Sequence, residues 1–252
     1  MIWATRTGQN RSRTAGFTLI ELVLVIVLVG VVATVATRMF SSSLENARYE
    51  HTEREMEQLA QAITGNPELY AGGARIDFGY VGDIGALPPN LDALIQNPGY
   101  PTWRGPYLVG GNDVNDFRRD AWGQPYGYGG GTIITSTGSG YDIEKELAGS
   151  TGELLANSVE GYVVDADNSV PATQQTSLTI TLNYPDGSGG TAASTINPAG
   201  DGSFAFSGIP IGYHPLKLVY LPDSDTLTRL VSVVPGQTTR ISIVFPADIW
   251  GI

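Results

Sequence analysis

The sequence predicts an α+β protein: one long N-terminal helix, then a small antiparallel sheet, then an all-β sandwich. Three observations predict this. Residues 17–36 are almost entirely apolar, apolar residues recur at helical spacing as far as residue 63, and short alternating segments fill the chain after residue 158. We expect five parts: a basic leader 1–16, a helix 17–65, a head 66–150, a linker 151–158 and a sandwich 159–252.

The apolar run is long enough to cross a membrane. Its 20 residues, Phe17 to Ala36, would span about 30 Å as an α-helix, the thickness of a hydrocarbon core. Arg6, Arg11 and Arg13 precede it, and no acidic residue comes before Glu21. This positive excess predicts that the N-terminus lies in the cytoplasm and that everything after Arg38 lies outside.

Glu21 is the exception within this run. An ionised carboxylate inside a membrane span costs about 2.5–3.5 kcal/mol at the helix centre and less near an end, so it is usually retained for a function. Proteolysis after Gly16 would create an amine on Phe17, four residues before Glu21. In a bundle of identical helices, the amine of one chain could pair with the Glu21 carboxylate of another.

These residues, G-F-T-L-I-E after a basic leader and before a long apolar run, resemble the prepilin signature of type IV pilins and type II secretion pseudopilins. The resemblance implies that prepilin peptidase cuts between Gly16 and Phe17 and methylates Phe17. It also implies that Glu21 is an assembly residue and that Gly30 gives the helix flexibility. The implied partners are other copies of the chain, other pseudopilins and an inner-membrane assembly platform.

Two alternative interpretations of the apolar run do not involve assembly with other copies of the chain. A plain signal anchor explains the apolar run but leaves Gly16, Phe17 and Glu21 as coincidences. A secretory signal peptide cut after Ala36 has small residues before the bond, but its apolar region would be unusually long and would contain an acid.

Composition limits the other functions. The formal charge of −11 becomes −14 if the three leader arginines are removed, which disfavours nucleic acid as a partner. There is no cysteine, and the two histidines, His51 and His214, are far apart in the chain. Thiol chemistry is excluded and a histidine-based active site has few parts, so we do not expect an enzyme.

The helix should continue beyond the membrane and then stop. Apolar residues recur at three- and four-residue spacing and include Met39, Phe40, Leu44, Ala47, Met56, Leu59, Ala60 and Ile63. Gly65, Asn66 and Pro67 then end the helix, because glycine can adopt a left-handed cap and proline cannot continue the helix.

The head gives a weaker pattern. We expect short strands at Tyr80-Val81 and at residues 132–135, and a tight turn in DAWGQPY. In that turn Asp120 would accept backbone N–H groups, Gly123 would take a positive φ, and Trp122 and Tyr126 would be buried. A carbohydrate-binding platform of these aromatic residues is the alternative.

The segments GDIGALPPNLDALI, WRGPYL and DAWGQPYGY are similar to major pseudopilins, in which a small antiparallel sheet packs on the C-terminal half of the long helix. That resemblance also implies a Ca²⁺ site in the segment TSTGSGYDIEKEL, residues 135–147. Asp142 is the weak candidate ligand there, with Glu144, Asp113 and Asp116 as further oxygen donors. A solvated polar loop is the alternative interpretation.

About seven segments after residue 158 alternate apolar and polar residues at roughly ten-residue spacing, which predicts an antiparallel sandwich with Greek-key connections. The strings EGYVVDADNSVPA and DGSFAFSGIPIGYHPLKLVY resemble carboxypeptidase-regulatory-like, or prealbumin-like, immunoglobulin-type modules. No single residue of this region is predicted to bind a ligand.

The expected function is that of a structural subunit of a type II secretion-like pseudopilus, single-pass in the inner membrane with its C-terminal parts in the periplasm or outside. One alternative is a type IV pilin-like subunit with an adhesive sandwich. The other is a monomeric membrane-anchored binding protein. No cofactor other than Ca²⁺ is implied.

Overall fold

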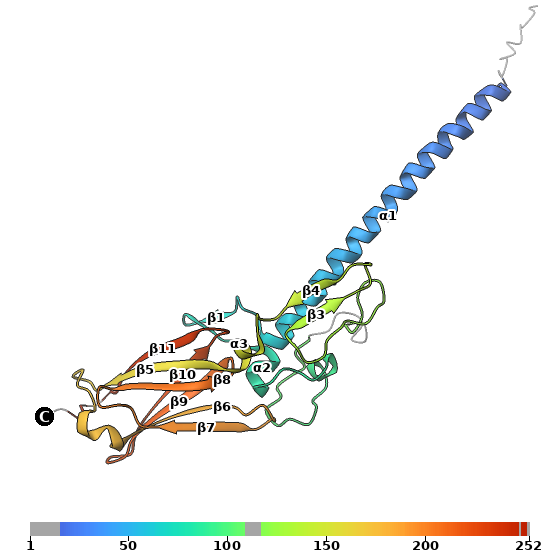
Figure 1. Ribbon diagram of the computed structural model, residues 1–252. Helices are drawn as coiled ribbons and strands as arrows, with labels where there is room; N and C mark the ends of the chain where they lie inside the picture. Colours follow the sequence, from blue (N-terminus) through green and yellow to red (C-terminus); the bar gives the residue numbers. More distant parts are fainter. Residues whose placement is uncertain (1–15, 109–116, 247, 251–252) are drawn as a thin grey trace, which may run out of the picture. The chain divides into compact units, whose positions relative to one another are not determined.

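The computed structural model describes residues 16–108, 117–246 and 248–250. The chain divides into two compact units, residues 1–47 and 48–252. Helix α1, Leu19–Thr64, belongs to both units and confirms the predicted long helix (Figure 1).

The end of α1 is fixed by a glycine and an arginine. Gly65 has φ 82°, and a Cβ on it would come within 2.4 Å of the backbone of Asp77, so only glycine fits there. The buried Arg75 guanidinium donates to the carbonyls of Thr64 at 2.5 Å and Gly65 at 3.1 Å. These bonds satisfy carbonyls at the end of the helix that have no partner within it.

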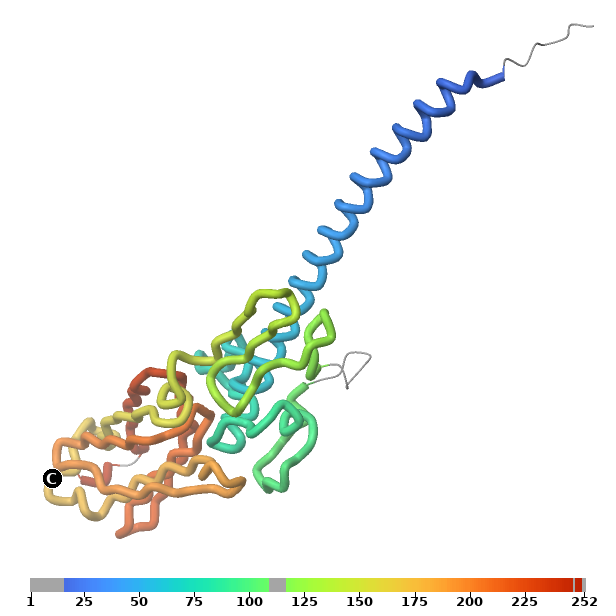
Figure 2. Tube along the Cα trace, turned by 45° about the vertical axis from the view of Figure 1, so that its right-hand side comes forward, coloured from blue at the N-terminus to red at the C-terminus, as the bar shows by residue number. Residues whose placement is uncertain are grey.

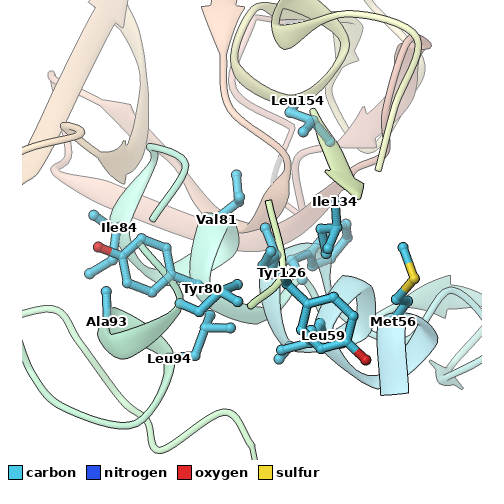
Figure 3. Close-up of a cluster of buried hydrophobic side chains, with 14 of the residues drawn as sticks. Met56, Leu59, Tyr80, Val81, Ile84, Ala93, Leu94, Tyr126, Ile134 and Leu154 are labelled. Carbon is cyan, nitrogen blue, oxygen red and sulfur yellow. The ribbon is translucent and has the colours of Figure 1, made fainter. Parts of the chain in front are cut away.

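The head surrounds the last turns of α1 with short elements. They are β1 (Tyr70–Ala71), β2 (Ala74–Arg75), α2 (Gly79–Ile84), η1 (Leu91–Leu94), β3 (Ile133–Ser136) and β4 (Ile143–Glu146). Strands β3 and β4 form an antiparallel pair whose Ile134 and Ile143 join the same apolar core as Met56, Leu59 and Ile63 of α1. Figure 3 shows Ile134, Met56 and Leu59 in this core. The predicted small antiparallel sheet on the C-terminal half of the helix is therefore present.

One predicted strand is wrong. Tyr80 and Val81 lie in α2, not in a strand, although both are residues with high β-propensity. Tyr80, Val81 and Ile84 are all fully buried against the head core, and Gly85, at φ 77°, ends the helix. Packing of this short turn therefore overrides the local preference of its residues.

The turn DAWGQPY is as predicted. The Asp120 carboxylate is 4% exposed and accepts from the backbone N–H groups of Trp122 at 3.0 Å and Gln124 at 2.9 Å, while Gly123 has φ 84°. Its second oxygen accepts from the Ser136 hydroxyl at 2.7 Å and the Gly138 N–H at 3.0 Å. One carboxylate thus ties the turn to β3 and to the loop after it.

Helix α3 (Thr151–Leu155) connects the head to a sandwich that follows at once. The sandwich strands are β5 (Asn157–Val164), β6 (Leu178–Pro185), β7 (Thr191–Ile196), β8 (Ser203–Ile209), β9 (Gly212–Tyr220), β10 (Asp225–Val233) and β11 (Thr238–Val244), with η2 (Ala172–Ser177) before β6. One sheet has the order β10-β9-β6-β7 and the other β11-β5-β8 (Figure 1). The alternating side chains of β6 and β9 lie in the core between them, as predicted.

The sandwich is not wholly antiparallel, which corrects the prediction. Strand β11 pairs with β5 in parallel, with Ile241 opposite Gly161. These are the last and first strands of the sandwich, so the intervening strands serve as the crossover that a parallel pair requires.

The sandwich and the head pack together within the second unit (Figure 2). The N–H of Gly187 donates to the Ile84 carbonyl at 2.9 Å, and the N–H of Ile211 donates to the Leu154 carbonyl at 2.9 Å. The Ser232 hydroxyl donates to the Arg75 carbonyl at 2.8 Å.

Candidate functional site

No other described part of the chain packs around the N-terminal part of α1. Every large apolar residue from Phe17 to Val35 is between 50% and 82% exposed. By length and composition, α1 can cross a membrane. The exposed apolar surface is far larger than a monomer in water tolerates, so lipid or other helices must cover it.

The hydroxyls within this segment are satisfied locally. Thr34 donates to the Gly30 carbonyl at 2.8 Å, and Thr37 donates to the Ala33 carbonyl at 2.8 Å. Each therefore bonds the carbonyl four residues earlier, as serine and threonine do where no water is available.

Glu21 forms a capping box with Thr18. Its Oε2 accepts from the Thr18 backbone N–H at 3.0 Å and from the Thr18 hydroxyl at 2.8 Å, while the Glu21 N–H donates to Thr18 Oγ1 at 3.3 Å. These bonds occupy donors at the start of α1 that have no helical partner. Both bonds to the carboxylate use Oε2, so Oε1 has no donor among the residues that the structure describes.

Sequence reasoning missed the role of Thr18. The signal was present, because a threonine three residues before a glutamate at the start of an apolar run is the pattern of a capping box. In a membrane these hydrogen bonds partly compensate the cost of removing the Glu21 carboxylate from water.

Gly16 and Phe17 precede α1 in an exposed, non-helical segment. A Cβ added to Gly16 would meet open space, and so would one added to Gly30 in the middle of the apolar run. Among the residues that the structure describes, none therefore requires glycine at either position.

The predicted Ca²⁺ ligands do not form an acidic cluster among the residues that the structure describes. Asp142 is exposed, and no group of three or more His, Asp or Glu side chains suited to a metal occurs in the described part of the chain. The buried carboxylate nearest the predicted loop, Asp120, already accepts four hydrogen bonds. Asp113 and Asp116 lie outside the described residues.

The aromatic residues of DAWGQPY are not an exposed platform. Tyr126 is 7% exposed and donates to the Glu55 carboxylate of α1 at 2.9 Å, and Trp122 packs against the head core. This favours the structural interpretation of the turn over carbohydrate binding by these two side chains.

Comparison with known proteins adds one match to the N-terminal segment. Residues 11–37 match the family described as the prokaryotic N-terminal methylation motif. This match supports a pilin-like subunit of structural, non-enzymatic type with a single-pass membrane anchor. No curated protein matches the chain.

Two solved structures are weakly similar. One is the dioxygenase domain of a dioxygenase and carbohydrate-binding protein fusion from Streptomyces sp. SirexAA-E, with 16% identity, TM-score 0.29, and coverage of 38% of this chain and 83% of that one. The other is a putative carbohydrate binding protein from Pseudomonas aeruginosa, with 16% identity, TM-score 0.25, and coverage of 36% of this chain and 90% of that one. Similarity this low supports no conclusion about function.

Proposed function

We propose that this chain is a structural subunit of a type II secretion-like pseudopilus. In this proposal prepilin peptidase removes residues 1–16 and methylates Phe17. The subunit then waits in the inner membrane, with its N-terminus in the cytoplasm and its second unit in the periplasm. An assembly platform extracts it, and α1 becomes part of the filament core.

The observation that carries the proposal is the combination of the methylation motif with an apolar helix that no described part of the chain covers. A membrane anchor needs only the apolar surface, whereas a filament subunit also needs a residue that sets the register between neighbouring helices. Glu21 fits that need, because its Oε1 can accept from the Phe17 amine of a neighbour.

Substitution of Glu21 tests this role. We expect Glu21→Leu to insert into the membrane normally, since it removes an unfavourable charge, but to lose most of its incorporation into sheared filaments. Incorporation is measured by immunoblot of the filament fraction against the membrane fraction. Glu45→Gln, outside the apolar run of the same helix, is the control and should assemble normally.

Two results would count against the proposal. One is normal filament incorporation of Glu21→Leu. The other is a failure of the wild-type chain to co-assemble with the other pseudopilins of its own cell, which would favour the membrane-anchored binding protein instead.

The sandwich keeps a second candidate function open, that of a type IV pilin-like subunit with an adhesive, immunoglobulin-like module. The supporting observation is that strands β5–β11 form a sandwich with its own apolar core, beyond the head that packs on α1. Loss of surface adhesion rather than of protein secretion on deletion of the gene would favour this alternative.

A further inference from the structure

The two sheets of the sandwich end in edge strands, β10 and β7 in one sheet and β11 and β8 in the other. An edge strand presents backbone N–H and C=O groups that the sheet itself leaves unpaired. Native proteins usually protect such a strand with a charge, a proline, a bulge or a covering segment, because an unprotected edge pairs readily with another chain.

Three of these edges carry a protective feature. Strand β10 has the exposed Arg229, and β11 has Arg240, whose Nε lies 3.5 Å from Glu160 Oε2. Strand β8 is irregular, because its pairing with β5 shifts register near Gly208, which has φ 71°.

Strand β7 differs from the other edges. Its sequence, TAASTI, contains no charged residue and no proline, and its pairing with β6 has no register shift between Thr191 and Ile196. Among the described residues, β7 makes no backbone hydrogen bond outside this pairing. Figure 1 shows β7 at the outer edge of its sheet, beside β6.

The register shows which groups of β7 point away from β6. The Asp186 N–H donates to the Gly190 carbonyl at 3.1 Å, and these two residues stand opposite each other in the register of the pair. Hydrogen-bonded and non-hydrogen-bonded pairs alternate in an antiparallel ladder, so every second residue of β7 bonds to β6, beginning with Ala192. The backbone groups that point to the free edge therefore belong to the alternate residues Thr191, Ala193 and Thr195.

The side chains at this edge leave room for another strand. Those of Thr191, Ala193 and Thr195 are exposed on the outer face, while the small side chains of Ala192 and Ser194 are partly buried on the core face. An added strand would bond to the free backbone groups and place alternate side chains beside these small residues. Such strand addition derives its affinity from backbone hydrogen bonds and its specificity from alternate side chains.

The charges around β7 select the kind of segment that fits. Asp186 precedes the strand and Asp201 follows it, and both are exposed. Hydrogen bonds from the Ser188 and Gly190 N–H groups lower the pKa of the Asp186 carboxyl, and bonds from Ser203 lower that of Asp201. Both ends of β7 are therefore negatively charged at neutral pH.

Basic residues near β7 do not offset these carboxylates. The sequence has no lysine or arginine between Lys145 and Lys217. Lys217 lies on β9, and β6 separates β9 from β7. Arg104 lines the same cleft as Thr191, but its Nε lies 3.9 Å from Asp83 Oδ1, which compensates its charge.

These charges oppose a second copy of the chain as the occupant. An antiparallel pair of two β7 strands centred on Ala193 would place the Asp186 turn of each copy beside the Asp201 turn of the other. Like charges brought together in this way repel, and the net charge of the chain is already −11. A segment with basic ends has the complementary charge.

We propose that β7 binds an extended segment of another protein, which joins the sheet as a further strand and carries lysine or arginine at its ends. The segment bonds to the free N–H and C=O groups of Thr191, Ala193 and Thr195. The proposal does not depend on assembly into a filament.

The test uses the full chain in a non-ionic detergent. The probes are fluorescent, end-blocked peptides in which threonine alternates with valine, isoleucine, tyrosine or phenylalanine, with two lysines at each end. Two matched sets replace the lysines by glutamates, or two central threonines by prolines, which lack the N–H group. Fluorescence anisotropy should show binding of at least one lysine peptide, and its glutamate and proline counterparts should bind about tenfold more weakly or less.

Two variants locate the site. Ala193→Pro removes an N–H that points to the free edge, where proline is tolerated, and Ala193→Lys adds a charge to that edge. Each should weaken binding of the lysine peptide about tenfold or more. Ala205→Lys, at an exposed position on β8, adds the same charge to the other sheet and should bind as wild type does.

The proposal is overturned if no lysine peptide binds, or if the proline peptides bind as tightly as their counterparts. Equal weakening by Ala205→Lys and Ala193→Lys would also overturn it, because attraction to the overall charge would then explain the binding. Sedimentation of the wild-type chain as a dimer that Ala193→Lys dissociates would assign the edge to a second copy instead.

Discussion

Asp120 shows how one residue can organise a segment with little regular structure. Its carboxylate accepts four hydrogen bonds from three separate parts of the head, and it is almost fully buried. A turn with two glycines nearby has little stability of its own, so this carboxylate replaces the hydrogen bonds that a longer sheet would supply.

Removing that carboxylate should destabilise the second unit. We expect Asp120→Ala to lower the free energy of unfolding by about 3 kcal/mol, because hydrogen bonds to a charged acceptor are lost and buried donors are left unpaired. Denaturant unfolding monitored by tryptophan fluorescence measures this. Asp142→Ala, at an exposed position in the neighbouring loop, should have an effect below about 0.5 kcal/mol; equal effects would contradict this account.

His214 makes the stability depend on pH. It is 2% exposed, its Nε2 lies 2.8 Å from the Pro210 carbonyl, and burial lowers its pKa from the ordinary value of 6.5. Below that value the unfolded chain therefore takes up a proton that the folded chain does not. The stability contributed by the neutral ring is present above about pH 6.5 and falls as the pH falls below it.

Substitution of this histidine isolates its contribution. We expect His214→Gln to reduce the loss of thermal stability between pH 7 and pH 5, even if the variant is less stable at pH 7. A loss in His214→Gln as large as in wild type would contradict the role of this ring.

At the scale of elements, the end of α1 depends on a residue that is distant in the sequence. Arg75 donates to the last carbonyls of the helix and stacks on Phe78 with its guanidinium 4.7 Å from the ring centre. The cap therefore links α1, β2 and the start of α2.

Removing this cap should be costly. We expect Arg75→Met to lower the free energy of unfolding by about 2–3 kcal/mol, since it keeps the apolar stem but leaves buried carbonyls without donors. Denaturant unfolding measures the change. Arg229→Met, at an exposed position on β10, is the matched control and should change stability by less than about 0.5 kcal/mol.

The elements also show what sequence patterns can predict. The end of α1 at Thr64 was predictable, because Gly65 and Pro67 act locally. Strands β6 and β9 were predictable from alternation, because one face of each is buried. Tyr80-Val81 was not, because its helical turn is imposed by packing against the head core.

Longer-range features could not be predicted for the same reason. The parallel pairing of β11 with β5 joins strands some eighty residues apart, and no local pattern encodes it. The Arg75 cap likewise arises only when distant segments meet. By contrast, the candidate assembly residues Gly16, Phe17 and Glu21 are adjacent in the sequence, so their relation could be read directly from it.

At the scale of the whole molecule, the two units differ in how far their apolar side chains are buried. The second unit, residues 48–252, buries two apolar cores of its own. In the first unit, the apolar part of α1 is not buried by any other described residue. The apolar part of α1 therefore needs a membrane or other helices to cover it, and the proposed filament subunit would meet both in turn.

The N-terminus of the mature protein tests this account most directly. Mass spectrometry of the protein from its own membrane should find a chain that begins at Phe17 and carries an N-methyl group. A mature chain that begins at Thr37, or one that keeps Met1, would contradict the central claim that this helix is processed for assembly.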